Sequence, residues 1–92
     1  MQLKDTTAMM CSDDYIERFR AEYIQTKIRY EKLKKLNNKI EAANLTKFNP
    51  PSKTVEMPKH DCPEQLLRNQ QHIMGDYLHI LEVRAVIENI EL

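Results

Sequence analysis

The chain has 92 residues, of which 41% are hydrophobic and 30% charged, with one Gly, four Pro and no Trp. This composition favours one small helical domain over a sheet protein or a disordered tail. Fourteen Lys and Arg balance fourteen Asp and Glu, so the formal net charge is zero. That balance weighs against general DNA binding and against attraction to an anionic membrane.

The sequence contains no apolar run long enough for a membrane span and no apolar core of a signal peptide. We therefore expect a cytoplasmic protein without a membrane partner. The two cysteines, Cys11 and Cys62, precede successive long helices and would lie at opposite ends of an antiparallel hairpin. We expect both to be reduced thiols.

Residues 3–11 have helical spacing of apolar and Thr side chains and predict a short helical arm. Ser12 follows it as the expected N-cap of a long helix over residues 13–44. Asp13 and Asp14 would then lie in the first turn, where carboxylates complement the exposed amides.

The helix expected over 13–44 carries a seam of side chains that alternate at spacings of three and four. The seam positions are Ile16, Phe19, Tyr23, Thr26, Tyr30, Leu33, Asn37 and Ile40. The two polar members, Thr26 and Asn37, are expected to fix the register of pairing. Ile24 and Ile28 lie off the seam, so this helix needs more than one neighbour.

Residues 45–61 contain three prolines and predict a long loop. We expect three apolar side chains, Phe48, Val55 and Met57, to pin this loop to the bundle. A second helix follows over residues 62–90. Asp61 and Glu64 have the spacing of a capping box at its start.

The second helix is apolar over about half of its circumference. Gly75 lies in its middle, where its missing side chain indicates a close helix approach. The predicted fold is therefore all-α: one domain over residues 1–92, formed by an antiparallel hairpin of two long helices with a short N-terminal arm. A single hairpin cannot cover both apolar faces, so we expect completion as a homo-oligomeric bundle, most simply of four helices.

The sequence has no glycine-rich phosphate loop and no nucleophile beside a base. His72 and His79 are seven residues apart, about 10 Å along a helix, which is too far to chelate one metal ion. His60, Asp61 and Cys62 lack the paired spacing of a zinc site. We expect neither an enzyme nor a bound cofactor or metal.

The C-terminal half of the first long helix is strongly basic: six Lys and Arg stand against one Glu between residues 27 and 39. One interpretation is a solvated face, because Lys suits an exposed helix and the dipole favours cations near its end. The other is a site for a nucleotide or phosphate, with tyrosine rings beside fixed charge. The candidate ligand-binding residues are Tyr23, Lys27, Arg29, Tyr30 and Arg84.

The stretch DDYIERFRAEYIQTKIRYEKL, from Asp13 to Leu33, and the stretch from Cys62 to Leu92 carry a specific pattern. It consists of ERF-x-AEY and IRY-x-KL, then CP-x-x-LL and LE-x-RA. This pattern resembles a family of short proteins of tailed phages and prophages that is named after a crAss-like phage member. The resemblance implies an accessory protein of a phage acting in the host cytoplasm, and it implies no activity or site residue.

Two classes of function follow from these observations. The first is antagonism of host defence by stoichiometric binding, in which the protein sequesters a signalling nucleotide or masks a host defence protein. The second is a nucleic-acid-associated or replication accessory role. Binding of signalling nucleotides would favour the first class, and salt-sensitive retention of DNA would favour the second.

Overall fold

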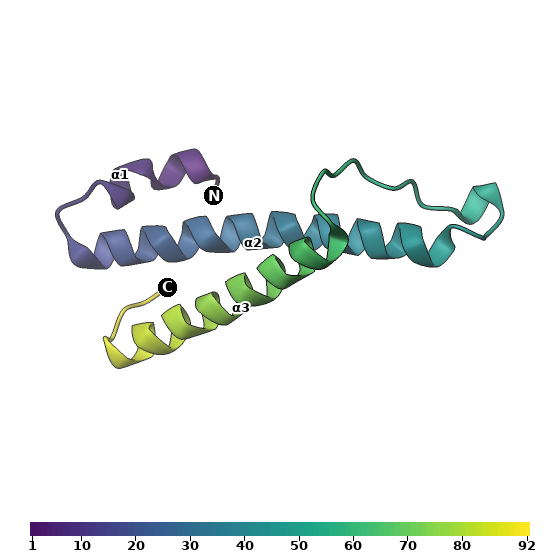
Figure 1. Ribbon diagram of the computed structural model, residues 1–92. Coiled ribbons are helices and arrows are strands. Elements are labelled where there is room, and N and C mark those ends of the chain that lie inside the picture. Colours follow the sequence, from purple (N-terminus) through teal and green to yellow (C-terminus); the bar gives the residue numbers. More distant parts are fainter.

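The computed structural model describes all 92 residues and contains helices without strands (Figure 1). The molecule is elongated, with principal extents of 55 × 25 × 21 Å. In chain order the elements are a 3-10 helix Leu3–Thr6, α1 Thr7–Met10, α2 Tyr15–Thr46, a 3-10 helix Pro51–Lys53 and α3 Glu64–Ile87. The predicted all-α class with two long packed helices is confirmed.

Helix α2 begins two residues later than expected, and Ser12 does not cap it. Asp14 is the N-cap, and its carboxylate accepts a hydrogen bond of 3.0 Å from the Ile16 amide. Ser12 instead accepts a hydrogen bond from the Asp14 amide, and its carbonyl accepts one from the Arg18 guanidinium. Ser12 lies two residues before the N-cap Asp14, so its hydroxyl bonds to the Asp14 amide and not to the free amides of the first helical turn.

The two long helices run antiparallel, and α3 diverges from α2 toward its own C-terminus (Figure 1). Their main core lies where α2 begins and α3 ends. It consists of Phe19, Tyr23, Leu78, Leu81, Ala85 and Ile90, with Tyr30 packed against it. The predicted seam is confirmed for its aromatic members, but Ile16 is 40% exposed and lies outside the core.

The last residues of the chain fill the angle between the diverging helices (Figure 1). Asn89 adopts a left-handed conformation, with φ of 56°, and ends α3. The Ile90 amide then donates to the Ala85 carbonyl, as in a Schellman motif. The reversal buries the Ile90 side chain, and the Arg20 guanidinium holds the tail by donating to the Glu91 carbonyl at 2.7 Å.

Near the loop, side-chain amides join the two helices. Asn37 is buried and donates to the Leu67 carbonyl at 3.2 Å and to the Gln71 side-chain oxygen at 2.8 Å. Asn44 donates to the Glu64 carboxylate at 3.0 Å. Asn37 thus lies in the predicted seam and fixes which residue of α3 faces it.

The connection between α2 and α3 is the long proline-containing loop that was expected, but its side chains are not buried as predicted. Phe48 is 91% exposed, and Val55 and Met57 are each 40% exposed. Hydrogen bonds hold the loop instead, because the Thr54 hydroxyl lies within bonding distance of three carbonyls and the Val55 amide donates to Thr46.

The predicted capping box at the start of the second helix is wrong. Helix α3 begins at Glu64 with Pro63 as its N-cap, and no side chain caps its first turn. Glu64 is engaged by Asn44 and lies 3.9 Å from His60, so its carboxylate is directed away from the position that a capping box needs.

The N-terminal arm folds back along α2 (Figure 1). Thr6 is fully buried, and its hydroxyl accepts a hydrogen bond of 2.8 Å from the Gln25 side chain. The arm covers the off-seam side of α2, which explains why that helix carries apolar residues outside its seam. Cys11 after the arm and Cys62 before α3 are free and exposed.

Candidate functional site

The structure brings together three of the five predicted ligand residues. Tyr23, Lys27 and Tyr30 lie on one side of α2 and line a shallow hollow of about 230 Å³ between α2 and α3. Arg29 is exposed and lines no hollow, because it lies two residues from Lys27 and therefore about 200° around the helix. Arg84 lines a different hollow, so the five residues do not form one site.

Tyr23 is largely buried and spans the two helices. Its hydroxyl donates a hydrogen bond of 2.6 Å to the Glu82 carboxylate of α3. Burial, together with this bond and the negative charge of Glu82, raises the pKa of Tyr23 to about 12. The Lys27 ammonium lies 5.6 Å from the centre of the Tyr23 ring, in the range of a cation–π contact.

Tyr30 forms the floor of the same hollow and lies against the backbone of α3. A Cβ atom at Gly75 would lie 3.3 Å from Tyr30 Cε1, so only glycine leaves the ring its full space. The predicted close helix approach at Gly75 is therefore confirmed. The rest of the lining consists of Lys27, Glu31, Leu78 and Glu82, which gives the hollow two carboxylates and one cation.

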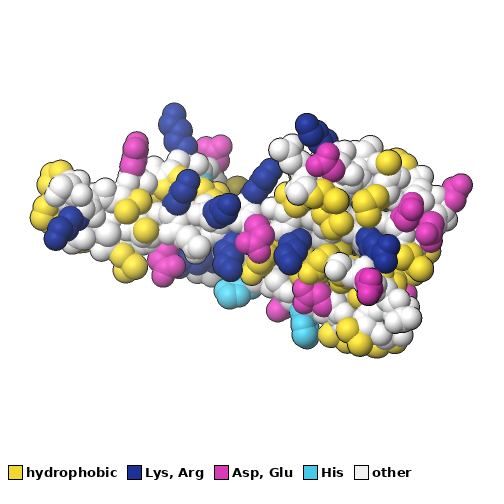
Figure 2. Space-filling view, turned by 180° about the vertical axis from the view of Figure 1, so that it is seen from behind, with side chains coloured by type: hydrophobic (Ala, Val, Ile, Leu, Met, Phe, Trp, Pro, Cys, Tyr) yellow, Lys and Arg dark blue, Asp and Glu magenta, His cyan; other side chains and the backbone are white.

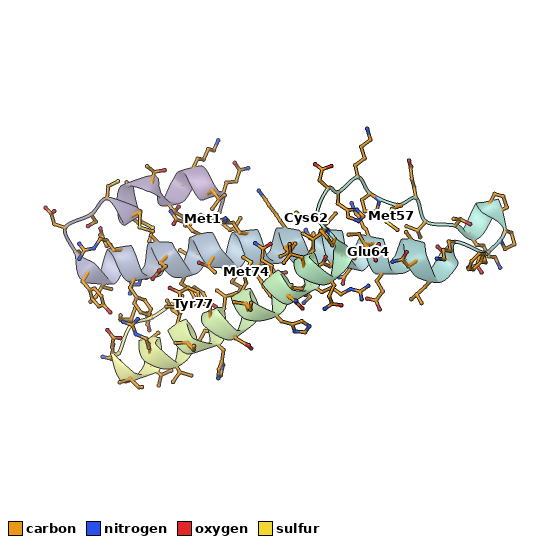
Figure 3. All side chains as sticks on the ribbon, viewed as in Figure 1. Met1, Met57, Cys62, Glu64, Met74 and Tyr77 are labelled. Carbon is orange, nitrogen blue, oxygen red and sulfur yellow. The ribbon has the colours of Figure 1, made fainter.

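A larger and more basic groove lies on the other side of Lys27, between α2 and the N-terminal arm. It measures about 420 Å³ and is lined by Met1, Ile24, Lys27, Ile28, Glu31, Lys32 and Lys35. Three lysines against one glutamate give a local charge of +2. Figure 3 places Met1 at the end of the arm, where it covers α2.

A second hollow of about 450 Å³ continues this groove along the arm. It shares Met1, Ile28 and Lys32 with the first and adds Lys4 and Leu3. The two hollows together, called the arm groove below, present an apolar floor of Ile24 and Ile28 with lysines along its rim. Lys27 stands between the arm groove and the tyrosine hollow and lines both.

The basic residues of α2 carry no intramolecular ion pair. The ion pairs of the structure are His60 with Glu64 and Arg84 with Glu88. Figure 2 shows Lys and Arg side chains following the middle of the molecule, and acidic side chains gathered where α2 begins and α3 ends. The cations of residues 27–39 are thus available to an external anion.

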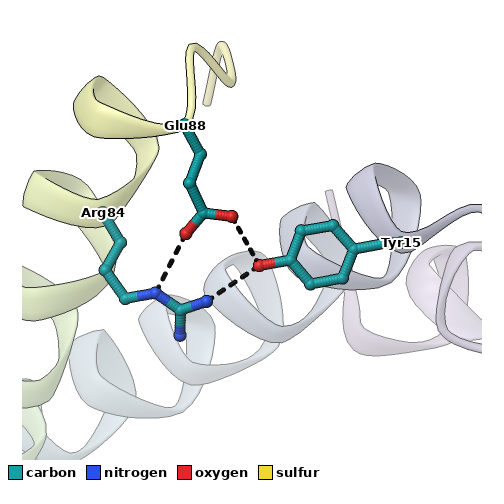
Figure 4. Close-up of polar contacts among 3 residues, drawn as sticks. All are labelled: Tyr15, Arg84 and Glu88. Carbon is teal, nitrogen blue, oxygen red and sulfur yellow. Dashed lines mark hydrogen bonds and ion pairs between the residues drawn. The ribbon is translucent and has the colours of Figure 1, made fainter.

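Arg84 belongs to a polar cluster at the acidic end (Figure 4). Its guanidinium donates to the Glu88 carboxylate at 3.1 Å and to the Tyr15 hydroxyl at 2.8 Å, and it lies 5.1 Å from the Phe19 ring. The Tyr15 hydroxyl donates to Glu88 at 2.7 Å, which closes a triangle. The bond from Tyr15, followed by that from Arg84, lowers the pKa of Glu88.

Arg84 therefore does not line the hollow that contains Tyr23 and Tyr30. Its guanidinium donates hydrogen bonds to Glu88 and Tyr15. The hollow that Arg84 lines also contains Arg18, Phe19 and Glu22. Sequence reasoning missed the arm groove. A signal for it was present, because Ile24 and Ile28 lie off the seam and require a covering segment.

None of the helices is both long and apolar enough to span a membrane. No three or more His, Cys, Asp or Glu side chains are grouped so that they could hold a metal ion. The fold and the grooves define a small helical-hairpin protein with exposed cations beside an apolar floor.

The chain belongs to the Sequestin family, whose model matches residues 13–87. The match spans α2, the loop and α3, and it does not include the N-terminal arm. The family name suggests binding or sequestration of a partner. No curated protein and no solved structure matches the chain significantly.

Proposed function

We propose that this protein is a non-enzymatic binding protein that sequesters a signalling nucleotide, acting as a phage or prophage antagonist of host defence in the host cytoplasm. The family name supports sequestration as the general mode of action. We further propose that it acts as a homo-oligomer.

The observation that carries the proposal is the arm groove. Its apolar floor of Ile24 and Ile28 offers a surface for a planar base or ribose, and its lysine rim offers charge to phosphates. Lysine binds phosphate as a point charge, without requiring one orientation of the anion. Because these lysines form no ion pair within the chain, binding a phosphate breaks none.

Lys27 gives the site a second contact surface. It lies over the Tyr23 ring and faces the hollow that contains Tyr30, so one cation borders both the arm groove and a tyrosine floor. A ligand with two phosphates or two rings could therefore contact the arm groove and the tyrosine hollow at the same time. Glu31 borders the same two hollows and supplies an acceptor for amino or hydroxyl groups.

The test is to titrate the purified chain with a panel of linear and cyclic nucleotides and to measure each affinity by calorimetry. The double variant Lys32→Ala/Lys35→Ala removes two rim charges and should weaken binding by about tenfold or more. The matched control Lys34→Ala/Lys39→Ala removes the same charge from residues that line no hollow, and it should change affinity by less than about threefold. Equal effects of both pairs, or no binding of any nucleotide, would contradict the proposal.

The second candidate is a nucleic-acid-associated accessory role, and the unpaired cations of residues 27–39 favour it. At 100° per residue these cations span roughly 220° of the circumference of α2, whereas a duplex would contact one narrower face. Retention on DNA that falls steeply with salt, without nucleotide binding, would support this role. Capture of one host defence protein by the chain would point instead to masking.

A further inference from the structure

We propose that the outer face of α3 is a self-association surface, on which a second copy of the chain packs antiparallel. The surface consists of four residues that we call the outer stripe: Leu66, Ile73, Ile80 and Ile87. They are 56%, 68%, 54% and 77% exposed. This inference specifies the surface of the homo-oligomer proposed above and does not depend on which ligand is bound.

The outer stripe is separate from the face that packs against α2. At 100° per residue it is centred roughly 120° around the helix from the buried Leu67, Leu78 and Leu81. Helix α3 thus has two apolar faces, and the hairpin covers one of them. Tyr77 borders the exposed face, and its hydroxyl is tied to Glu22 of α2 at 2.7 Å (Figure 3).

The spacing of the stripe is that of a helix-pairing seam. Its members recur every seven residues over 21 residues, a length of about 32 Å. A strict repeat of seven keeps one face toward a partner helix, which scattered surface apolar residues would not do. A solvated helix face has no reason to repeat large aliphatic residues at this interval.

The occupant that fits best is the same stripe of a second chain. A two-fold axis between residues 76 and 77 places Leu66 opposite Ile87 of the second copy and Ile73 opposite Ile80. Every apolar residue of the stripe then meets an apolar residue, which is the self-complementarity of an isologous interface. The monomer also needs such burial, because only 12 of its 92 residues are buried.

The charges of α3 select the antiparallel orientation. Residues 64–75 carry Glu64 and Arg68, which balance to zero. Residues 76–92 carry four acids, Asp76, Glu82, Glu88 and Glu91, against Arg84, a balance of −3. Parallel pairing would bring two acidic halves together, whereas antiparallel pairing sets each acidic half against a neutral one.

The first test measures the mass of the ligand-free full chain by sedimentation at micromolar concentration. The wild type should have at least twice the 10.9 kDa mass of one chain. The variant Ile73→Asp/Ile80→Asp should be monomeric. The control Val86→Asp changes a residue that is 81% exposed and lies roughly 130° from the stripe, and it should keep the wild-type mass.

The second test holds even if the double variant unfolds. In a Cys11→Ser/Cys62→Ser background, Leu66→Cys and Ile87→Cys are purified separately and treated with a short bismaleimide. Antiparallel pairing predicts crosslinking in the mixture of the two and little in either alone. Crosslinking of each alone would show parallel pairing, and a monomeric wild type or no crosslink would overturn the self-association. Because no nucleotide is present, failure here leaves the nucleotide proposal standing.

Discussion

The two ends of the hairpin are held together by different means. At the end where α2 begins, the apolar end, Phe19, Leu81 and Ile90 pack into one cluster. At the loop end, the amide end, Asn37 and Asn44 join the helices by directional hydrogen bonds, beside the buried Ile40. The apolar end supplies most of the burial, and the amide end supplies the register.

This difference bears on where a ligand can bind. At the apolar end α3 and the C-terminal tail pack against Phe19 and Tyr23, and the exposed first turn of α2 carries both an acid, Glu17, and a base, Arg18. The amide end joins the helices through a few specific bonds and leaves the cations of residues 27–39 exposed. Because only Asn37 and Asn44 make these polar contacts to α3, α2 holds the fold together at this end and still exposes lysines that have no ion-pair partner.

The largest expected effect is at the apolar end. Leu81 is fully buried, and Leu81→Ala should lower the free energy of unfolding by about 2–5 kcal/mol through lost burial and a cavity. Val86→Ala, on the exposed side of the same helix, should change it by less than about 0.5 kcal/mol. Urea unfolding at a fixed protein concentration measures both, and equal losses would contradict the placement of the core.

The next effect is at the amide end. Asn37→Ala removes the side-chain donor to the Leu67 carbonyl and to the Gln71 side-chain oxygen, which should cost about 1–3 kcal/mol. The neighbouring Asn38 is exposed, so Asn38→Ala should be close to neutral. Urea unfolding measures the free energy of unfolding of Asn37→Ala and of Asn38→Ala. A loss at Asn37 as small as that at Asn38 would remove the distinction between the two ends.

The sequence was sufficient to predict the helices but not their starts. The periodicity of Phe19, Tyr23 and Tyr30 identified the inner face of α2, because burial alone decides that pattern. Ser12, Asp13 and Asp14 are all good caps, and the Arg18 bond to the Ser12 carbonyl helps to fix the turn that leaves Asp14 as cap. That bond depends on three-dimensional geometry and has no signature in the spacing.

The candidate site was predictable only where a single helix determines it. Tyr23, Lys27 and Tyr30 are brought together by the pitch of α2, at spacings of four and three. The position of Arg84 depends on how α3 diverges, and the arm groove depends on the arm folding back over Ile24 and Ile28. Both are tertiary features, which local periodicity does not encode.

Tyr23 offers a smaller, pH-dependent test within the apolar end. Its pKa is about 12 in the folded chain, against an ordinary value of 10.0. Between these values the unfolded chain loses the proton while the folded chain keeps it, so stability is full below pH 10 and falls as the pH rises. The loss should be about 3 kcal/mol at most.

The variant Tyr23→Phe has no hydroxyl to titrate and should show a shallower loss of stability between pH 10 and 12. Tyr15→Phe is the comparison at an exposed site: the bond to Glu88 also raises the pKa of Tyr15, but solvent screens it, so the slope should change less than in Tyr23→Phe. Urea unfolding across this pH range measures the slope for each chain. An unchanged slope in Tyr23→Phe would mean that the bond to Glu82 does not persist in solution.

The smallest effect is expected at Glu88, in the exposed triangle with Tyr15 and Arg84. Its pKa lies below the usual 4.5 because Tyr15 and Arg84 donate to the carboxylate. The resulting stabilisation is present above pH 4.5 and disappears as the pH falls through the lowered value. Glu88→Gln should therefore differ from the wild type near neutral pH and converge with it in acid.

Glu91→Gln removes the same charge from a side chain that makes no hydrogen bond, since the tail is held through the Glu91 carbonyl. It should match the wild type at every pH, and added salt should reduce the Glu88→Gln effect, because exposed ion pairs are screened. Thermal unfolding at several pH values compares the three chains. If Glu88→Gln and Glu91→Gln behave alike, the triangle contributes nothing to the apolar end, and the packing of Leu81 and Ile90 holds it alone.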